Sequence, residues 1–390
     1  MKSKSIAKTA IRILRSWQRL FLPSLINNDG RININAKKRI RSILITRFHL
    51  VGDMILFIPI LRELRKLFPK AKIDLLAFEP SGIETIRECP YIDQILIYWG
   101  GKGFIKKWFG RLKTRMIGYD IFITSCAETN LAREGFYFGA KYMIGFKEKA
   151  RFGVIYKEEE PYLLDISLDY DPNIHEVDQN LKIVQALGAD KPDNTLEYYI
   201  TEKDSLYIKD LLLNEFHLSG AGPLIVIHAG SKQPQKRWIP ERFAEVGKRL
   251  VEHFGACVIF IGVEQEANLI GEIIKKMGGR GLDLSGRTTL GQLSALLKQI
   301  DILICNDSGP MHLAAVVGAP SVILWGPGEY ANWRPIGDPE KVRIIRHKVP
   351  CSPCHKLDCE DNICMKLIAI DEIYEAVEKM LSNLGWKEVH

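Results

Sequence analysis

The stretch "CNDSGPMHLAAVVGAPSVILWG", residues 305–326, has the pattern of a buried strand end, a sharp turn, a short helix and a second strand. Gly309 suits the turn, and Pro310 suits the first position of the helix. Neither Asp307 nor His312 is needed to make such a turn. A strand that runs into a helix with two extra polar side chains at the junction indicates an α/β fold with a ligand site beyond the strand end.

The alternation of strands and helices continues in both directions along the 390 residues. Strand-like runs stand at 42–47, 72–78, 94–99, 119–125, 223–230, 256–262 and 301–307. The pattern weakens between about 150 and 200 and restarts near Glu197, which predicts two Rossmann-like domains facing across a cleft. We expect a basic extension at 1–40, an acceptor-binding domain at 41–198, a nucleotide-sugar-binding domain at 199–370 and a terminal helix at 371–390.

The formal net charge of +7 is concentrated at the N-terminus. Twelve Lys and Arg residues precede Asp53, against the single acidic residue Asp29. This asymmetry favours an anionic partner, which could be a nucleic acid, a membrane surface or a phosphorylated substrate. No apolar run reaches the length of a membrane span, and arginines interrupt what would be the core of a signal peptide. We therefore expect a cytoplasmic protein.

Residues 4–21 have the period of an amphipathic helix. One face is basic: it carries Lys4, Lys8, Arg12, Arg15 and Arg19. The other face is apolar and carries Ile6, Ala10, Ile13, Leu14, Trp17 and Phe21. Such a helix either lies on the inner face of the cytoplasmic membrane or packs on the surface of the protein itself.

Polar residues follow four successive strands of the second half of the chain. Gly230 and Ser231 offer a close backbone approach and a hydroxyl, and Lys236 adds a positive charge, a combination that suits a diphosphate. Glu264 follows the next strand and could accept ribose hydroxyls. Thr289 is placed to cap a helix.

The fourth strand end is the quoted stretch itself. The helix that begins after Ser308 would bind an anion at its N-terminus, and His312 could donate to a phosphate or sugar oxygen. We expect Asp307 to face sugar hydroxyls, because a phosphate would repel it. Each residue alone could be a cap, a buried histidine or a solvated charge, but their repetition at successive strand ends favours a binding site.

In the first half of the chain, the segment "TRFHLVGD" at 46–53 occupies the corresponding strand end. Gly52 permits close approach, and Arg47 could contact an acceptor. Asp53 either caps the following helix or acts as a base, since an ordinary aspartate is ionised at neutral pH. Further along, the basic and aromatic segment 101–115 includes Lys106, Lys107 and Arg111. It could bind an anionic lipid-linked acceptor or be a solvated face, and no nucleic-acid motif accompanies it.

Four cysteines, Cys351, Cys354, Cys359 and Cys364, have the spacing C-x2-C-x4-C-x4-C. Reduced structural thiols, a zinc site and haem attachment at "CSPCH" are the alternatives, and we favour reduced thiols. No cofactor or catalytic metal is expected.

The stretches at 43–77, 228–246 and 306–327 resemble glycosyltransferase family 9, which includes the ADP-heptose:lipopolysaccharide heptosyltransferases, and the resemblance spans about 41–370. It implies a GT-B fold and an inverting, metal-independent transfer from ADP-heptose to a lipopolysaccharide core. The implied roles are general base for Asp53, diphosphate ligand for Lys236, ribose ligand for Glu264 and adenine contact for Thr288. The family's Asp-(Thr/Ser)-Gly…His set falls on Asp307, Ser308, Gly309 and His312.

The residues before Gly52 depart from the family's usual small hydroxyl residues, since this chain has His49, Leu50 and Val51. The acceptor could therefore differ. Two other hypotheses are a non-catalytic sugar-nucleotide-binding or membrane-associated protein and a transferase of another sugar in cell-envelope polysaccharide synthesis. Asp53 discriminates between an enzyme and a binder, because binding alone needs no base.

Overall fold

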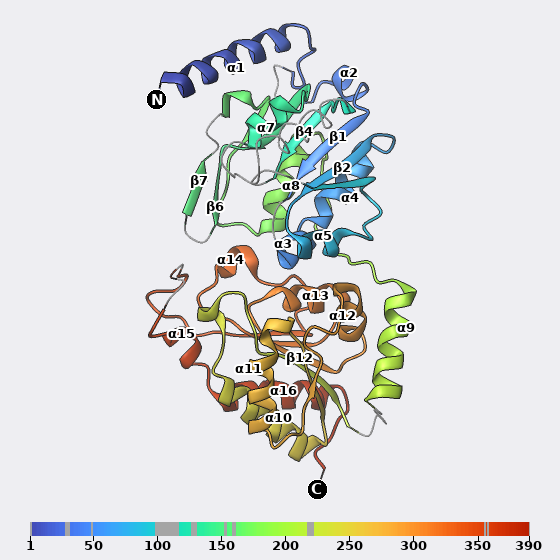
Figure 1. Cartoon of the computed structure of the whole chain (residues 1–390), viewed down its shortest axis with the longest axis vertical. Coiled ribbons are helices and arrows are strands. Elements are labelled where there is room, and N and C mark those ends of the chain that lie inside the picture. The colour runs from blue at the N-terminus through green and yellow to red at the C-terminus, as the bar shows by residue number, and fades with distance from the viewer. Residues whose placement is uncertain are drawn as a thin grey trace. The chain divides into compact units, whose positions relative to one another are not determined.

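The computed structural model describes residues 2–27, 32–47, 50–97, 117–125, 131–151, 154–157, 161–216, 222–354, 356 and 359–389. The chain divides into two compact units, Met1–Thr195 and Leu196–His390 (Figure 1). Each unit has its own parallel sheet of six strands.

The sheet of the first unit has the strand order β3-β2-β1-β4-β5-β8. Its strands are β1 (Ser42–Thr46), β2 (Lys72–Ala77), β3 (Gln94–Ile97), β4 (Ile121–Thr124), β5 (Tyr142–Phe146) and β8 (Ile166–Leu168). Ile45 of β1 pairs with Leu75 on one side and Ile123 on the other, and consecutive residues of β1 are buried. Burial on both faces is typical of a parallel strand that is covered by helices, and it explains the short, uninterrupted apolar runs.

The described helices of the first unit precede, connect or follow these strands. They are α1 (Lys2–Leu20), α2 (Ile34–Lys37), α3 (Val51–Ile55), α4 (Ile58–Leu67), α5 (Pro80–Ile86), α7 (Leu131–Tyr137) and α8 (Glu176–Ala186), with a 3-10 turn η1 (Pro161–Leu163). Helix α4 packs against α8, and α3 packs against α5. A small antiparallel hairpin, β6 (Glu148–Arg151) with β7 (Val154–Lys157), lies outside the main sheet.

The stretch 150–200, where the sequence pattern weakens, contains β7, β8 and α8. Strand β8 has only three residues, two of them half-buried, and the charged sequence "EKAR" of β6 lacks the apolar run of a core strand. Such short, partly exposed strands lack the pattern that predicts a strand from sequence.

The sheet of the second unit has the order β11-β10-β9-β12-β13-β14. Its strands are β9 (Leu224–His228), β10 (Cys257–Phe260), β11 (Leu282–Asp283), β12 (Ile302–Asn306), β13 (Ser321–Leu324) and β14 (Val342–Ile345). Its helices are α9 (Glu202–Asp210), which continues as a π turn η2 (Leu211–Glu215), α10 (Pro240–Phe254), α11 (Ala267–Lys276), α12 (Leu290–Leu297), α13 (Gly309–Val317), α14 (Tyr330–Trp333), α15 (Ile363–Lys366) and α16 (Ile370–Asn383), with 3-10 turns η3 (Pro234–Lys236) and η4 (Glu264–Glu266).

Both sheets have the doubly wound order 3-2-1-4-5-6, which confirms the predicted pair of Rossmann-like folds. In this order the chain moves outward from the first strand to one side and then from the fourth strand to the other. The two neighbouring central strands, β1 and β4 or β9 and β12, therefore have connections that leave in opposite directions. Ligands bind at this switch point, beyond the carboxyl ends of the strands.

The expected terminal helix is α16, which ends at Asn383. It packs against α10 and the strands β12, β13 and β14, and Ile373, Val377 and Leu381 are buried in the core of the second unit. The helix is therefore an integral part of that unit. No helix in the described parts of the chain is both long enough and apolar enough to span a bilayer.

Replacement of Ile304 by Ala tests the core of the second unit. Ile304 lies in the middle of β12 and is fully buried. The cavity and the lost apolar contacts should lower the free energy of unfolding by about 2–5 kcal/mol. Urea unfolding measures this change, with Leu206→Ala on the exposed face of α9 as the matched control. The control should change stability by no more than about 0.5 kcal/mol, and equal losses in both variants would contradict the assignment.

Candidate functional site

A side-chain clamp made by Asn306 organises the carboxyl edge of the second sheet. Its Nδ2 donates to the carbonyl oxygens of Ala229 (2.9 Å) and Gly230 (3.2 Å), and its Oδ1 accepts from the Trp238 amide (3.1 Å). Asn306 is fully buried, so the loss of this side chain would leave buried polar groups unsatisfied. The clamp joins both ends of the loop 229–238 to β12. Sequence analysis did not single out Asn306, although it directly precedes Asp307 at a strand end.

Side chains of the loop 229–238 also form hydrogen bonds within the loop. A Cβ at Gly230 would come within 2.0 Å of Glu266 Oε1, so any larger residue there would have to displace the Glu266 carboxylate. The Ser231 carbonyl accepts hydrogen bonds from Arg237 Nε (2.9 Å) and Nη2 (2.7 Å), and its hydroxyl accepts one from the Gln233 amide (3.3 Å). The predicted residues Gly230 and Ser231 therefore lie in an ordered loop, as a site that binds through its backbone requires.

Lys236 and Asp307 form an ion pair, with 2.6 Å between Nζ and Oδ2. The lysine stands at the end of η3 and the aspartate directly after β12, so the fold joins two residues that are 71 positions apart in the sequence (307 − 236). Asp307 is buried, whereas the Lys236 side chain keeps 18 % of its surface exposed. Lys236 thus places a partly exposed ammonium at the switch point, and its charge compensates the buried Asp307 carboxylate.

Ser308 is the N-cap of α13 by its backbone, but its hydroxyl makes no capping hydrogen bond. The hydroxyl instead donates to the Asn306 carbonyl (3.0 Å) and lies 3.1 Å from His228 Nδ1. The first turn of α13, which begins at Gly309 and contains the buried His312, is thus not capped by the Ser308 hydroxyl. The helix dipole adds positive potential at this end, which makes it suited to an anion.

His228 and Glu266 form a second buried pair at this edge, which sequence analysis missed. His228 Nε2 lies 3.5 Å from Glu266 Oε2. Burial by itself would raise the pKa of Glu266, but the hydrogen bond and charge of His228, the Val263 amide and the Arg237 charge together lower it below the ordinary value. Glu266 is therefore held as a carboxylate that supports His228, and through it Ser308.

The predicted ribose ligand Glu264 lies two residues earlier, on the same turn η4, and is exposed. Gly286, with φ +69°, would bring a Cβ within 3.1 Å of the Glu264 Cβ, so the loop before α12 packs closely on this turn. Thr288 is half-buried in that loop. Thr289 caps α12 as predicted, since its hydroxyl accepts from the Gln292 amide at 3.2 Å. The structure thus brings Glu264 close to the loop that carries Thr288.

In the first unit, three charged side chains meet beyond β1. Arg47 Nη2 lies 3.2 Å from Asp53 Oδ1 and 3.0 Å from Glu176 Oε1, and all three side chains are buried. The guanidinium also lies over the Phe57 ring, 5.4 Å from its centroid. Glu176 is the first residue of α8, where the helix dipole favours a carboxylate. Arg47 thus lies between two carboxylates and orients Asp53.

Glu176 belongs to the stretch in which the sequence pattern weakens, which is why it was missed. The signal that could have found it is the helix start: the His175 side chain accepts from the Val177 amide (3.3 Å) as an N-cap. Gly52 is buried in α3 next to Asp53. The other predicted acceptor residues, Lys106, Lys107 and Arg111, lie outside the described residues.

The four cysteines of the cluster are free thiols, and two of them accept hydrogen bonds from different backbone amides. Cys354 Sγ accepts from the Lys356 amide (3.5 Å), and Cys359 Sγ accepts from the Asn362 amide (3.3 Å). Burial, together with repulsion from Cys351 and Cys359, raises the pKa of Cys364, which keeps it a thiol at neutral pH. Within the described ranges, no three His, Cys, Asp or Glu side chains are grouped to hold a metal ion.

The sequence of this chain is similar to those of known proteins. The model of glycosyltransferase family 9 (heptosyltransferase) matches residues 112–363. Lipopolysaccharide heptosyltransferase 2 of Escherichia coli is 27 % identical over 322 residues, which cover 77 % of this chain and 87 % of that protein.

Two solved structures have the same fold. The glycosyl transferase family 9 protein from Veillonella parvula has a TM-score of 0.71 and 23 % identity, covering 88 % of this chain and 98 % of its own. The E. coli ADP-heptose LPS heptosyltransferase II has a TM-score of 0.70 and 21 % identity, covering 89 % and 100 %. The fold is therefore GT-B.

The pH dependence of stability tests the Glu266 pair. A carboxylate whose pKa is lowered in the folded state stabilises the fold above its unfolded pKa of about 4.3, and that contribution is lost as the pH falls through the folded pKa. Glu266→Gln should therefore be less stable than the wild type by about 1–3 kcal/mol at pH 7. The difference should shrink as the pH falls from about 5 to 3.

Urea unfolding at a series of pH values measures this difference. Glu264→Gln, an exposed glutamate on the same turn, is the matched control and should alter stability by no more than about 0.5 kcal/mol. A Glu266→Gln deficit that stays constant down to pH 3 would show that the carboxylate charge does not stabilise the fold.

Proposed function

This chain belongs to glycosyltransferase family 9, the heptosyltransferase family, and we propose that it transfers a heptose from ADP-heptose to a lipid-linked lipopolysaccharide core saccharide, with inversion at the anomeric carbon. The names of its relatives, lipopolysaccharide and lipooligosaccharide heptosyltransferases, support the sugar and the acceptor, and the name of the E. coli ADP-heptose LPS heptosyltransferase II supports the nucleotide. We place the reaction in the cytoplasm, where nucleotide-sugars are available.

The observation that carries the proposal is the Lys236–Asp307 pair directly before the N-terminus of α13. The ammonium and the helix end supply positive potential for a diphosphate from two independent elements. Gly230 and Ser231 allow its oxygens to approach the backbone. We assign Glu264 to the ribose and Thr288 to the adenine. We assign Asp307 to the sugar hydroxyls, and Ser308, Gly309 and His312 to the phosphates and the sugar oxygens beside them. The Lys236 ammonium and the N-terminus of α13 allow a metal-independent transfer.

On the acceptor side we assign the role of general base to Asp53. Arg47 orients this carboxylate and is itself held by Glu176. In the reaction, the acceptor hydroxyl oxygen forms a bond to the anomeric carbon while the bond from that carbon to the ADP oxygen breaks. The hydroxyl proton passes to Asp53, and the electron pair of the broken bond leaves with ADP, whose charge Lys236 and α13 stabilise.

Two alternatives give different outcomes. A sugar-nucleotide-binding protein without activity would bind ADP-heptose but release no ADP on addition of acceptor. A transferase of another sugar would release nucleotide only from a different donor. The assay that separates them measures ADP release from ADP-heptose, with and without lipid-linked core acceptor.

Asp53→Asn should leave donor binding unchanged and reduce transfer by about 10²–10⁴-fold, because an amide cannot accept the proton but can still accept the Arg47 hydrogen bond. ADP release measures turnover, and calorimetric titration with ADP measures binding. Glu176→Gln is the matched control, since it removes the other carboxylate from Arg47 without removing the base. We expect it to keep at least about a tenth of the wild-type turnover. Unchanged turnover in Asp53→Asn, or equal losses in the two variants, would overturn the base assignment.

Lys236→Ala should weaken the binding of ADP and of ADP-heptose alike. The loss should be about 10–100-fold, as expected for a charge-assisted hydrogen bond to a phosphate and for a buried Asp307 left without its cation. Lys232→Ala removes an exposed lysine from the same loop and should bind ADP as the wild type does. Equal ADP affinity in Lys236→Ala and the wild type would exclude the diphosphate role.

A further inference from the structure

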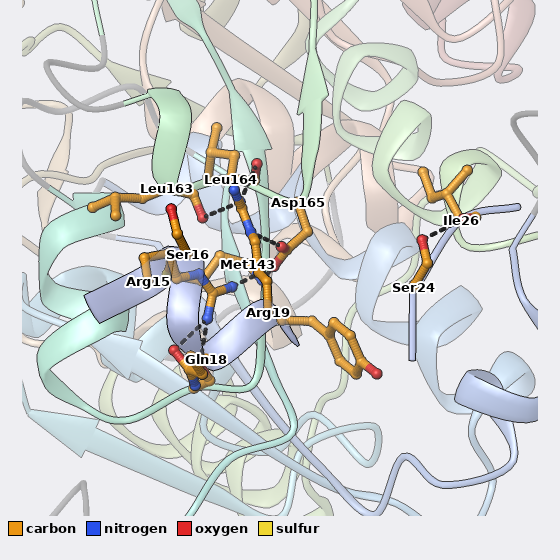
Figure 2. A network of polar contacts seen from close by, with 12 residues as sticks. Arg15, Ser16, Gln18, Arg19, Ser24, Ile26, Met143, Leu163, Leu164 and Asp165 are labelled. Carbon is orange, nitrogen blue, oxygen red and sulfur yellow. Dashed lines mark hydrogen bonds and ion pairs between the residues drawn. The ribbon is translucent and has the colours of Figure 1, made fainter. Parts of the chain in front are cut away.

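Helix α1 is attached to the first unit by its basic face (Figure 2). Arg15 is 1 % exposed and pairs with Asp165, and it also donates to the Ala140 carbonyl (3.3 Å). Arg19 Nε donates to the same carboxylate at 2.8 Å, and Gln18 Nε2 donates to the Ala140 carbonyl at 3.1 Å. These bonds orient α1 about its own axis relative to the domain that carries it.

Asp165 is itself fixed to the sheet. Its Oδ2 accepts from the amide of Met143 in β5 (2.8 Å). The Arg19 Nη2 donates to the carbonyls of Leu163 (3.3 Å) and Leu164 (3.0 Å), which lie just before Asp165. Ile11, on the same side of the helix, is buried in the core cluster of the first unit. The attachment therefore rests on backbone and core groups as well as on one ion pair.

The apolar face of α1 consequently points away from the protein. Its large side chains, with the last at the residue after the helix, are Ile13 (53 % exposed), Leu14 (58 %), Trp17 (64 %), Leu20 (79 %) and Phe21 (82 %). A surface helix ordinarily buries this face and exposes its charges, so the arrangement is reversed. A contiguous apolar surface of this kind on a folded protein indicates an interaction site.

We propose that the exposed face of α1, formed by Ile13, Leu14, Trp17, Leu20 and Phe21, docks the protein on an anionic lipid bilayer surface. Its sequence contains six basic residues (Lys2, Lys4, Lys8, Arg12, Arg15 and Arg19) and no acidic one. Asp165 offsets one of the two positive charges of Arg15 and Arg19, and the remaining charge of the helix attracts negatively charged headgroups. Large aliphatic side chains with Trp and Phe suit the boundary between headgroups and acyl chains.

The same charges disfavour a second copy of this chain as the occupant. Two copies that packed through α1 would place side by side two helices that each contain six basic residues and no acidic one, so their charges would repel. A bilayer with anionic lipids accepts the apolar face and compensates the charge. In this proposal α1 lies along the bilayer surface, because its basic face is held at Asp165 and its apolar face is left for the lipid.

Vesicle co-sedimentation of the full chain tests the proposal and does not depend on the proposed enzyme activity, because the vesicles contain no saccharide. The full chain should sediment with vesicles of phosphatidylethanolamine and phosphatidylglycerol and much less with phosphatidylcholine alone. The double variant Trp17→Ser/Phe21→Ser should bind at least about tenfold more weakly, since each large apolar side chain buried accounts for roughly a tenfold change.

The matched control is Leu206→Ser/Leu213→Ser, which removes two exposed apolar side chains from the second unit and should bind as the wild type does. Circular dichroism checks that both variants are folded, as expected for changes at exposed positions. Wild-type protein that stays in the supernatant, or equal binding of the Trp17/Phe21 variant, would overturn the proposal. So would a lipid-free dimer that the Trp17/Phe21 variant converts to monomer, because the face would then be a protein interface.

Discussion

The site of the second unit depends on the hydrogen bonds that the side-chain amide of Asn306 makes with the loop after β9. The sheet pairs β9 with β12 but leaves their connections running in opposite directions, so side chains must hold the rest of the loop after β9 against the end of β12. Asn306 makes that link by three hydrogen bonds from a fully buried position. With the loop held in this way, Lys236 lies within ion-pair distance of Asp307. The Ser308 hydroxyl contacts the main-chain carbonyl of Asn306 and the His228 ring.

Charges at the two switch points are buried only in combination. Lys236 compensates Asp307, His228 and Arg237 accompany Glu266, and Arg47 stands between Asp53 and Glu176. A buried charge without such a partner would cost several kcal/mol, so these pairs are a condition for placing charged groups beyond the strand ends at all. The pairs also fix the positions of these side chains before a ligand binds, which lowers the entropy cost of binding.

Helix α1 contacts the protein through charged side chains and leaves its apolar face exposed. Two arginines on its basic face satisfy one carboxylate that is fixed to β5, and the apolar face is left outside. The amphipathic period of 4–21 predicts the helix but allows either face to contact the protein. The geometry of Arg15, Arg19 and Asp165 decides between the two, since only one side of the helix can reach that carboxylate.

The sequence by itself determined the α/β class, the pair of doubly wound sheets, the family and the strand ends that carry Gly230, Lys236, Asp307 and Asp53. These follow from local patterns: short apolar runs, glycine turns and polar residues at fixed places after a strand. Tertiary structure alone decided which side chains meet. The Lys236–Asp307 and Arg47–Glu176 pairs join residues far apart in the chain, and Asn306, His228 and Glu266 have no local pattern that distinguishes them from core or helix residues. Pairing of charges across a sheet depends on strand order and loop path, which no short window of sequence contains.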